Sequence, residues 1–168
     1  MYLRNCETMR SDLNESMPAK KDAKLLWAMR SFKVWLLIAA AESVHGALRN
    51  ALMAPLLGDL KARQIAVFTG SAIVLGIAFI FHDWMRARTT RSQLSAGMIW
   101  VGFTVAFELG LGRLVIGLSW ERILSDYDLA KGGLMPIGLS IMFFAPAIAA
   151  RLRRGHTAYG QQTASDRT

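Results

Sequence analysis

The sequence has very little cysteine, and its acidic residues are far outnumbered. Cys6 is the one cysteine in 168 residues, so a single chain contains neither a disulfide framework nor a cysteine-based metal site. Twelve Asp and Glu residues stand against 20 Lys and Arg, which gives a net charge of +8. No Gly-x-Ser-x-Gly, His-Glu-x-x-His or phosphate-binding-loop pattern occurs, so no enzyme class is favoured. The N-terminus lacks the features of a secretory signal peptide, and we expect the first apolar helix itself to direct membrane insertion.

Apolar residues dominate what is present: 53% of the chain is hydrophobic, and its mean hydropathy is +0.29. This composition is typical of a membrane protein and too apolar for an ordinary soluble domain of this length. The Lys and Arg residues lie in short clusters between apolar runs, as they do in the loops of membrane proteins. They do not form the continuous basic surface of a nucleic-acid-binding domain. We therefore expect a lipid bilayer as partner, no nucleic acid and no cofactor.

Four apolar runs approach or exceed the length of about 20 residues that a helix needs to cross a bilayer. They cover residues 34–57, 65–81, 96–118 and 134–150. The sequence thus predicts an all-α, polytopic bundle of four transmembrane helices within a domain of residues 25–154. The second run carries no charge and predicts a plain span, whereas Pro146 inside the fourth predicts a kink.

Polar segments flank this predicted domain. Residues 1–24 and 155–168 predict disordered tails, because they hold too little apolar surface to fold alone. Residues 25–33 mix helical apolar spacing with Lys and Arg, which is typical of an interfacial helix, and Trp27 and Trp35 are expected at the headgroup level. Basic residues gather before the first span, between the second and third, and after the fourth. The positive-inside rule then predicts cytoplasmic termini in a bacterial inner membrane.

Charged residues occur at membrane depth in the first and third runs. Glu42, His45 and Arg49 lie within about 60° of one another on one face of a helix. Glu108 lies about 18 Å into the third run, level with His45 and Arg49. An ionisable group facing lipid costs about 2.5–3.5 kcal/mol. The sequence therefore predicts a polar cluster between the first and third spans.

Two interpretations of this cluster stay open. In the structural interpretation, two carboxylates and two guanidiniums form compensated pairs that hold the helices in register. In the functional interpretation, Glu42 or Glu108 binds a proton or cation beside His45. Arg49 or Arg113 then holds an anionic ligand. Arg113 lies about 140° around a continuous helix from Glu108, where it reaches toward the headgroups unless the neighbouring glycines unwind the helix.

The histidines do not suit a haem or zinc site. His45 lies at mid-membrane, His82 at a helix end and His156 in the C-terminal tail, so no two share a depth on facing helices. The Ser125–Asp128 loop offers oxygen atoms but lacks the glycine and spaced acids of a calcium loop. We expect no metal site, and expect this loop to be solvated, to cap a helix or to begin one.

Three segments within residues 40–151 carry a resemblance to known sequences: AESVHGALRN, LLGDLKARQIAVFTGS and AFELGLGRLVIGLSWERILSDYDLAKGGLMP. On these segments the chain resembles an uncharacterised family of small bacterial four-span membrane proteins. The resemblance implies a fold but no function. The Ala-Glu pair in an Ala-rich first span is also similar to small multidrug resistance transporters, whose first-helix Glu carries protons and cationic drugs. Those transporters are shorter and lack Arg49, Glu108 and Arg113, so the resemblance does not transfer their activity.

These observations lead to two functional expectations. Because the sequence contains no soluble catalytic unit, we expect a non-enzymatic accessory or interaction protein that contacts another membrane protein or a second copy of itself. The alternative is a proton- or cation-coupled small-molecule transporter. Its site would be formed by Glu42, His45, Arg49, Glu108 and Arg113.

Overall fold

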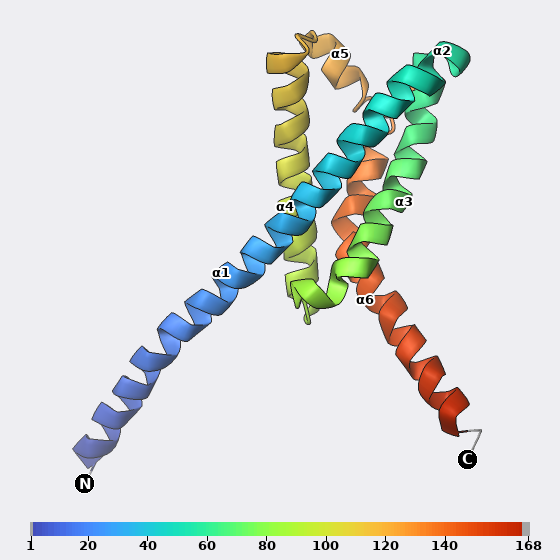
Figure 1. Ribbon diagram of the computed structural model, residues 1–168. Coiled ribbons are helices and arrows are strands. Elements are labelled where there is room, and N and C mark those ends of the chain that lie inside the picture. The colour runs from blue at the N-terminus through green and yellow to red at the C-terminus, as the bar shows by residue number, and fades with distance from the viewer. Residues whose placement is uncertain (1, 166–168) are drawn as a thin grey trace.

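The computed structural model describes the backbone of residues 2–165 and the side chains of residues 23–154. This described part is helical and contains no strand, which confirms the predicted all-α class (Figure 1). The elements are α1 (Tyr2–Leu48), the π-helical η1 (Arg49–Met53), α2 (Ala54–Leu57), α3 (Asp59–Met85), α4 (Thr90–Gly110), the π-helical η2 (Leu111–Val115), α5 (Trp120–Ser125), the 3-10 turn η3 (Leu129–Lys131) and α6 (Met135–Ser165).

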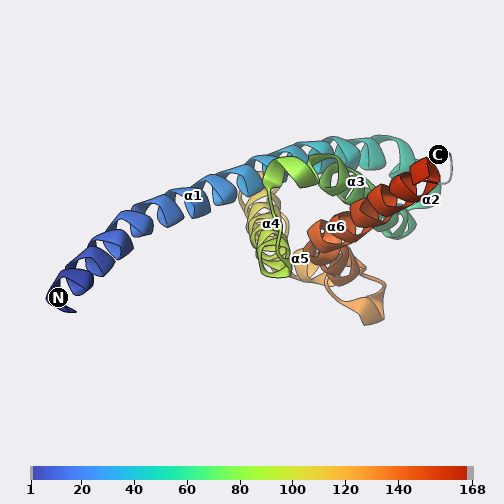
Figure 2. The same ribbon diagram turned by 90° about the horizontal axis from the view of Figure 1, so that it is seen from below.

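The four long helices alternate in direction along the chain. α3 and α4 each pack against both α1 and α6, so α1 and α6 lie on opposite sides of the α3–α4 pair. Figure 1 shows α1 crossing the other three, and Figure 2 shows it along one side of the group. We call the end with the α3–α4 turn (residues 86–89) the turn end, and the end with the α4–α6 connection (residues 116–134) the loop end.

Three helical segments are long and apolar enough to cross a membrane: Asp59–Met85, Thr90–Val115 and Met135–Arg154. Within their apolar windows only 22%, 17% and 28% of the residues are buried, so most apolar side chains face outward. An outward apolar surface of this extent is expected of lipid-facing helices. The fold therefore indicates a membrane location. The first predicted run, residues 34–57, is not among these segments, because its polar residues lower its hydropathy.

The first helix packs more deeply than the sequence predicts. The sequence predicts an interfacial helix over residues 25–33 that leads into the first span, and α1 passes through both without a break. Ser31, Val34 and Ile38 are all buried within the bundle. The physical reason is tertiary: these residues meet buried side chains of the other helices, which the local mixture of apolar and basic residues does not reveal.

Trp35 is a packing residue and does not mark the headgroup level. Its side chain is 7% exposed, and its Nε1–H donates to Thr104 Oγ1 at 3.1 Å. Its ring stacks on Phe32 and also contacts Phe103. The prediction from sequence is wrong here because an indole that finds a buried acceptor no longer needs the interface to satisfy its N–H.

The two predicted tails lie in helical extensions. α1 begins at Tyr2, within predicted tail 1–24, and α6 continues to Ser165, within predicted tail 155–168. Adding a residue to an existing helix gains a hydrogen bond without a new nucleation cost. A helix anchored in the bundle can therefore extend into a segment of polar sequence.

The hydrophobic core joins all four long helices. Its buried members are Val34, Trp35, Ile38, Val74, Ala78, Met85, Trp100, Met142, Ala145 and Ala149. Within it, Trp100 Nε1–H donates to the buried Ser31 carbonyl at 3.0 Å, joining α4 to α1. Gly97 allows a close approach of α4 to α6: a Cβ there would lie 1.9 Å from the Phe143 carbonyl oxygen. Small residues at helix crossings are the usual means of close packing in membrane bundles.

The helices that carry Glu42 and Glu108, α1 and α4, each continue into a π-helical segment at the loop end. In η1, the Ala54 N–H bonds to the Arg49 carbonyl five residues back, just before Pro55, which has no N–H to continue the ladder. In η2, the Ile116 N–H bonds to the Leu111 carbonyl at 3.0 Å. Gly117 then ends the helix at φ +74°, a conformation that favours glycine.

Candidate functional site

The best-defined polar contact at membrane depth joins α1 to α3. His45 Nδ1 lies 3.2 Å from Glu42 Oε2, and its Nε2 lies 2.8 Å from Thr69 Oγ1. Glu42 itself packs directly on α3, since a Cβ added at Gly70 would lie 2.7 Å from Glu42 Oε2. The i,i+3 spacing on α1 brings the carboxylate and imidazole together, and the crossing with α3 supplies the hydroxyl.

The direction of the Glu42–His45 hydrogen bond depends on which group holds the proton. When Glu42 is a carboxylate, which only accepts, His45 Nδ1 carries the hydrogen between them. Nε2 then either accepts from the Thr69 hydroxyl in the neutral imidazole or donates to it in the imidazolium. Glu42 Oε1 is buried, and no partner for it occurs among the described residues. The site is thus a short hydrogen-bonded chain with one unsatisfied carboxylate oxygen.

Arg49 and Glu108 lie near each other at the loop end. Arg49 Nε and Nη2 both donate to Asn50 Oδ1, at 3.2 and 2.8 Å. Glu108 interacts electrostatically with Arg49 and with Glu42, although no direct ion pair between them is formed. Arg49 is half-buried, whereas Glu108 is exposed on the surface of the isolated chain. The two groups therefore share a neighbourhood without a direct bond.

Arg113 lies apart from these residues. It is exposed in η2, donates from Nη1 to the Leu118 carbonyl at 3.1 Å, and lies with its guanidinium carbon 5.7 Å from the Trp120 ring centroid. This geometry corresponds to the outward alternative, in which the side chain reaches toward the headgroup level. The π-helical segment does not turn it inward.

The predicted polar cluster between the first and third runs is therefore not confirmed in that form. The Glu42–His45 pair packs against α3, which belongs to the second run, and only Glu108 comes from the third. Sequence reasoning missed Thr69, although it is one of two hydroxyl residues in an otherwise apolar run. Its role depends on where α1 crosses α3, which helical periodicity alone does not determine.

A second missed residue is Tyr127, in the connection between α5 and α6. Its hydroxyl is buried, and no hydrogen-bond partner for it occurs among the described residues. Burial raises the pKa of the phenol above its ordinary value, and the negative charge of Glu108 raises this pKa further. The Tyr127 phenol therefore lies close to Glu108, which also interacts with Arg49.

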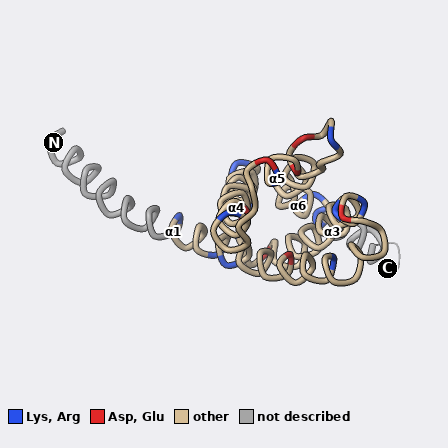
Figure 3. The backbone as a smooth tube through the Cα atoms, turned by 90° about the horizontal axis from the view of Figure 1, so that it is seen from above, with Lys and Arg blue, Asp and Glu red and all other residues tan. Residues whose placement is uncertain are grey.

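Ion pairs fasten the loop end to the start of α3. Arg122 bonds to Asp59 at 2.8 Å and to Asp126 at 3.3 Å. Arg63 pairs with the same two carboxylates, at 3.2 Å from Asp59 and in direct contact with Asp126. Figure 3, which looks onto this end, shows acidic and basic positions on both segments. We call these four residues the loop ion-pair network. The sequence shows their charges, but it does not indicate which residues pair.

The Ser125–Asp128 loop has local structural roles. Ser125 ends α5, with its hydroxyl donating to the Arg122 carbonyl at 2.7 Å, and Asp128 Oδ1 accepts from the Ala130 N–H at 3.0 Å to begin η3. Within the part of the chain whose side chains are described, no group of three His, Cys, Asp or Glu residues is placed to hold a metal ion.

Comparisons with known proteins add no relative to these observations. The chain matches no protein-family model, no curated protein and no solved structure. Fold and site define an all-α protein in which three of the described helical segments are long and apolar enough to cross a membrane. The functional argument therefore starts from its geometry.

Proposed function

We propose that the chain crosses a bacterial inner membrane four times, with residues 34–57 as the first crossing and both termini in the cytoplasm. Support comes from the contacts of α1 at the two ends of the bundle. At the turn end, Arg30 donates to the Trp84 carbonyl at 3.3 Å. At the loop end, η1 and α2 pack against α3. The first helix therefore runs the full height of the other three, and the basic clusters all fall at one end.

We propose further that the protein is a non-enzymatic accessory protein that binds another membrane protein through the surface formed by Arg49 and Glu108, which we call the α1–α4 polar surface. The single observation that carries this proposal is that Glu108, at the surface of α4, forms no hydrogen bond or ion pair with another described residue. Glu108 is seven residues before the end of its apolar segment at Val115, about 10 Å along the helix axis. Its carboxylate thus lies within the hydrocarbon region.

A carboxylate exposed to lipid at this depth is unfavourable by about 2.5–3.5 kcal/mol. Two charged groups lie nearby, but Arg49 bonds to Asn50 and Glu42 contacts His45, so neither pairs directly with this carboxylate. A partner helix with a hydrogen-bond donor or a cation at the matching depth would remove this cost, because polar contacts between helices replace contacts with lipid. The isolated chain therefore has an incomplete polar surface that a protein partner completes.

Site-specific photocrosslinking tests this proposal. A benzophenone amino acid at Phe107, the exposed neighbour of Glu108, should form an adduct with another membrane protein in cells. The same amino acid at Phe144, exposed on α6 at the opposite side of the bundle, is the matched control and should not. Glu108→Gln should lower the Phe107 adduct, whereas Glu121→Gln on α5 should not.

Three results would contradict an accessory role. Equal adducts at Phe107 and Phe144 would indicate random collision in the membrane. An adduct that contains only a second copy of the chain would replace the partner by a homo-oligomer. Purification of that homo-oligomer with its own transport activity would identify the protein as the transporter itself.

A proton- or cation-coupled transporter is the alternative proposal, and one observation favours it. Glu42 Oε1 is buried and unsatisfied, while the other carboxylate oxygen contacts an imidazole that continues to Thr69. Buried carboxylates beside histidines are the groups through which membrane transporters relay protons. The two proposals differ in whether Glu42 is needed for proton movement, and the substitution Glu42→Gln tests this difference.

A further inference from the structure

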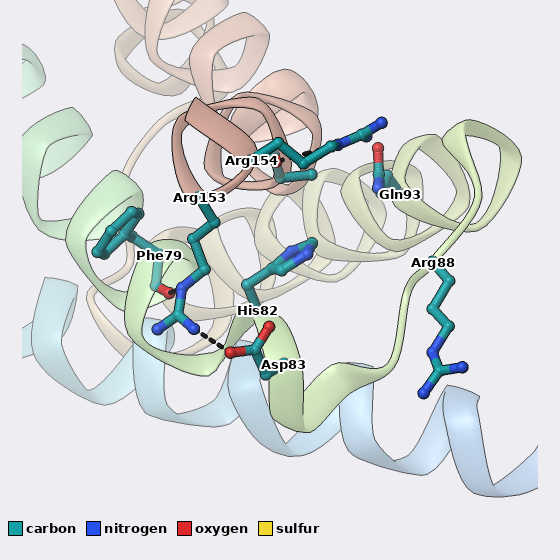
Figure 4. A pocket seen from close by; sticks show the side chains of 8 residues that line it. Phe79, His82, Asp83, Arg88, Gln93, Arg153 and Arg154 are labelled. Atoms are coloured by element: carbon teal, nitrogen blue, oxygen red, sulfur yellow. Dashed lines mark hydrogen bonds and ion pairs between the residues drawn. The ribbon is translucent and has the colours of Figure 1, made fainter. Parts of the chain in front are cut away.

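A shallow basic recess lies at the turn end, opposite the α1–α4 polar surface. Its volume is about 510 Å³, and it is open on one side. The residues that line it come from α3, the α3–α4 turn, α4 and α6: Phe79, His82, Asp83, Arg88, Gln93, Ala150, Arg153 and Arg154. Figure 4 shows the His82 ring between the two α6 arginines and Gln93.

The recess carries a net positive charge. Three guanidiniums, those of Arg88, Arg153 and Arg154, stand against the single carboxylate of Asp83. Arg153 contacts Asp83 directly and also donates from Nε to the Phe79 carbonyl at 3.1 Å. These bonds hold Arg153 in place and neutralise Asp83. The lining thus holds three basic side chains and one acidic side chain, and Arg153 is fixed in place from α3.

A buried histidine nitrogen lies beside the recess. His82 Nδ1 is buried, and no partner for it occurs among the described residues. The neighbouring Gln93 is 3% exposed, and its Nε2–H donates to the Ala87 carbonyl at 3.0 Å, which fixes the α3–α4 turn. Buried polar atoms are almost always satisfied in folded proteins. Because Nδ1 has no exposed surface, a ligand in the recess reaches it only after the His82 ring turns, and acceptor oxygens would then satisfy it as a donor.

The level of the recess limits what the ligand is. One end of each apolar segment lies at this level: the first segment ends at Met85, the second begins at Thr90, and the third ends at Arg154. The recess thus lies where phospholipid headgroups meet the hydrocarbon region. Phe79 and Ala150 supply an apolar wall beside the arginines. Basic pockets between transmembrane helices on the cytoplasmic side are suited to anionic lipid headgroups.

We propose that this basic recess binds the phosphate of an anionic glycerophospholipid. Arg88 and Arg154 contact the phosphate oxygens, and the His82 ring turns toward the recess so that Nδ1–H donates a further hydrogen bond. Phe79 lies against the glycerol and upper acyl chains. This proposal shares with the proposed function only the membrane location. Because the recess lies at the other end of the bundle, either proposal can fail while the other holds.

Native mass spectrometry of the full chain in detergent micelles tests the site. The probes are phosphatidylglycerol, phosphatidylcholine and inorganic phosphate, each titrated separately. Wild-type protein should retain one phosphatidylglycerol in preference to phosphatidylcholine. The variants Arg88→Gln and Arg154→Gln should each weaken that binding by roughly fivefold, and the double variant by roughly 10- to 30-fold.

Arg151→Gln is the matched control, since Arg151 is an exposed arginine on the same helix and at the same level but does not line the recess. It should bind phosphatidylglycerol within about twofold of wild type if the recess, rather than general surface charge, provides the affinity. Arg88 is exposed in a turn, so its variant tests the site even if the Arg154 variant does not fold.

Two outcomes would overturn the proposal. Equal weakening by Arg151→Gln and Arg88→Gln would show that only the general positive potential attracts the lipid. Binding of inorganic phosphate at millimolar concentration, without retention of phosphatidylglycerol, would assign the recess to a free phosphate and exclude the lipid.

Discussion

At the scale of single residues, two buried oxygen atoms differ in what they cost. Glu42 Oε1 and the Tyr127 hydroxyl are both buried, and neither finds a partner among the described residues. A buried hydroxyl without a partner costs about 1–3 kcal/mol, and a carboxylate costs more because its charge is also desolvated. The Tyr127 hydroxyl is therefore a local packing defect, whereas the Glu42 carboxylate is a candidate for proton binding.

Tyr127→Phe removes the unsatisfied hydroxyl and keeps the ring. We expect the variant to be more stable than wild type by about 1 kcal/mol, because the desolvation cost disappears. The folded pKa of Tyr127 is raised, so above the ordinary phenol pKa of about 10 the unfolded state loses its proton first. Wild-type stability should therefore fall as pH rises beyond that value.

Denaturation monitored by tryptophan fluorescence at increasing pH measures this effect. The fall in stability above about pH 10 should be shallower in Tyr127→Phe than in wild type. Tyr127→Leu, which also removes the ring, is the control for packing and should destabilise the protein. A Phe variant less stable than wild type at neutral pH would mean that the hydroxyl has a partner after all.

Glu42→Gln separates the two functional proposals. Because Arg49 bonds to Asn50 and not to Glu42, the substitution leaves no arginine stranded, and the glutamine oxygen can still accept from His45 Nδ1–H. We therefore expect the variant to accumulate normally with a loss of about 1 kcal/mol or less. Under the accessory proposal, neither wild type nor variant moves protons into reconstituted vesicles.

A pH-sensitive dye inside those vesicles provides the measurement, with Glu108→Gln examined in parallel. Proton uptake by wild type that Glu42→Gln abolishes, in a variant of unchanged stability, would establish the transporter proposal in place of the accessory one. Uptake that persists in both variants would exclude both carboxylates as the coupling group.

At the scale of elements, the sequence predicts what depends on local periodicity. The apolar runs at 65–81, 96–118 and 134–150 correspond to α3, α4 with η2, and α6, because about 20 apolar residues have no other stable conformation in a bilayer. The i,i+3 contact between Glu42 and His45 follows equally from helix geometry. Thr69, Tyr127 and the basic recess depend on helix crossings, which local spacing does not encode.

Gly97→Ala tests the closest of these crossings. The added Cβ would meet the Phe143 backbone carbonyl at 1.9 Å, so α4 and α6 must separate. We expect a loss of about 1–3 kcal/mol or failure to accumulate. Gly102→Ala, in the same helix with open space around it, should be neutral or stabilising by up to about 1 kcal/mol.

Thermal denaturation in detergent, followed by circular dichroism, compares the two alanine variants directly. Equal stability of both would mean that α4 and α6 do not approach each other at Gly97. Because both substitutions replace a helical glycine in α4, their difference reports the helix crossing and not helix propensity.

At the scale of the whole molecule, the two ends of the bundle have different chemistry. The turn end gathers the basic recess, whereas the loop end is held by paired acids and arginines in the loop ion-pair network. The positive-inside rule concerns basic residues near short loops, and it favours the turn end as cytoplasmic. The first helix is then the element on which the number of crossings depends.

Single-cysteine labelling in a Cys6→Ser background tests that number. Ala23, Thr90 and Ala130 are exposed positions within α1 before the predicted first crossing, at the turn end and at the loop end, respectively. If residues 34–57 cross the membrane, cysteines at 23 and 90 should share the cytoplasmic side, and the cysteine at 130 should react with a membrane-impermeant maleimide added outside. If they do not cross, position 23 must lie on the same side as position 130, because the three apolar segments still place positions 90 and 130 on opposite sides. Labelling at 23 together with 130 would therefore refute the four-span topology, and external labelling at 90 would reverse its orientation.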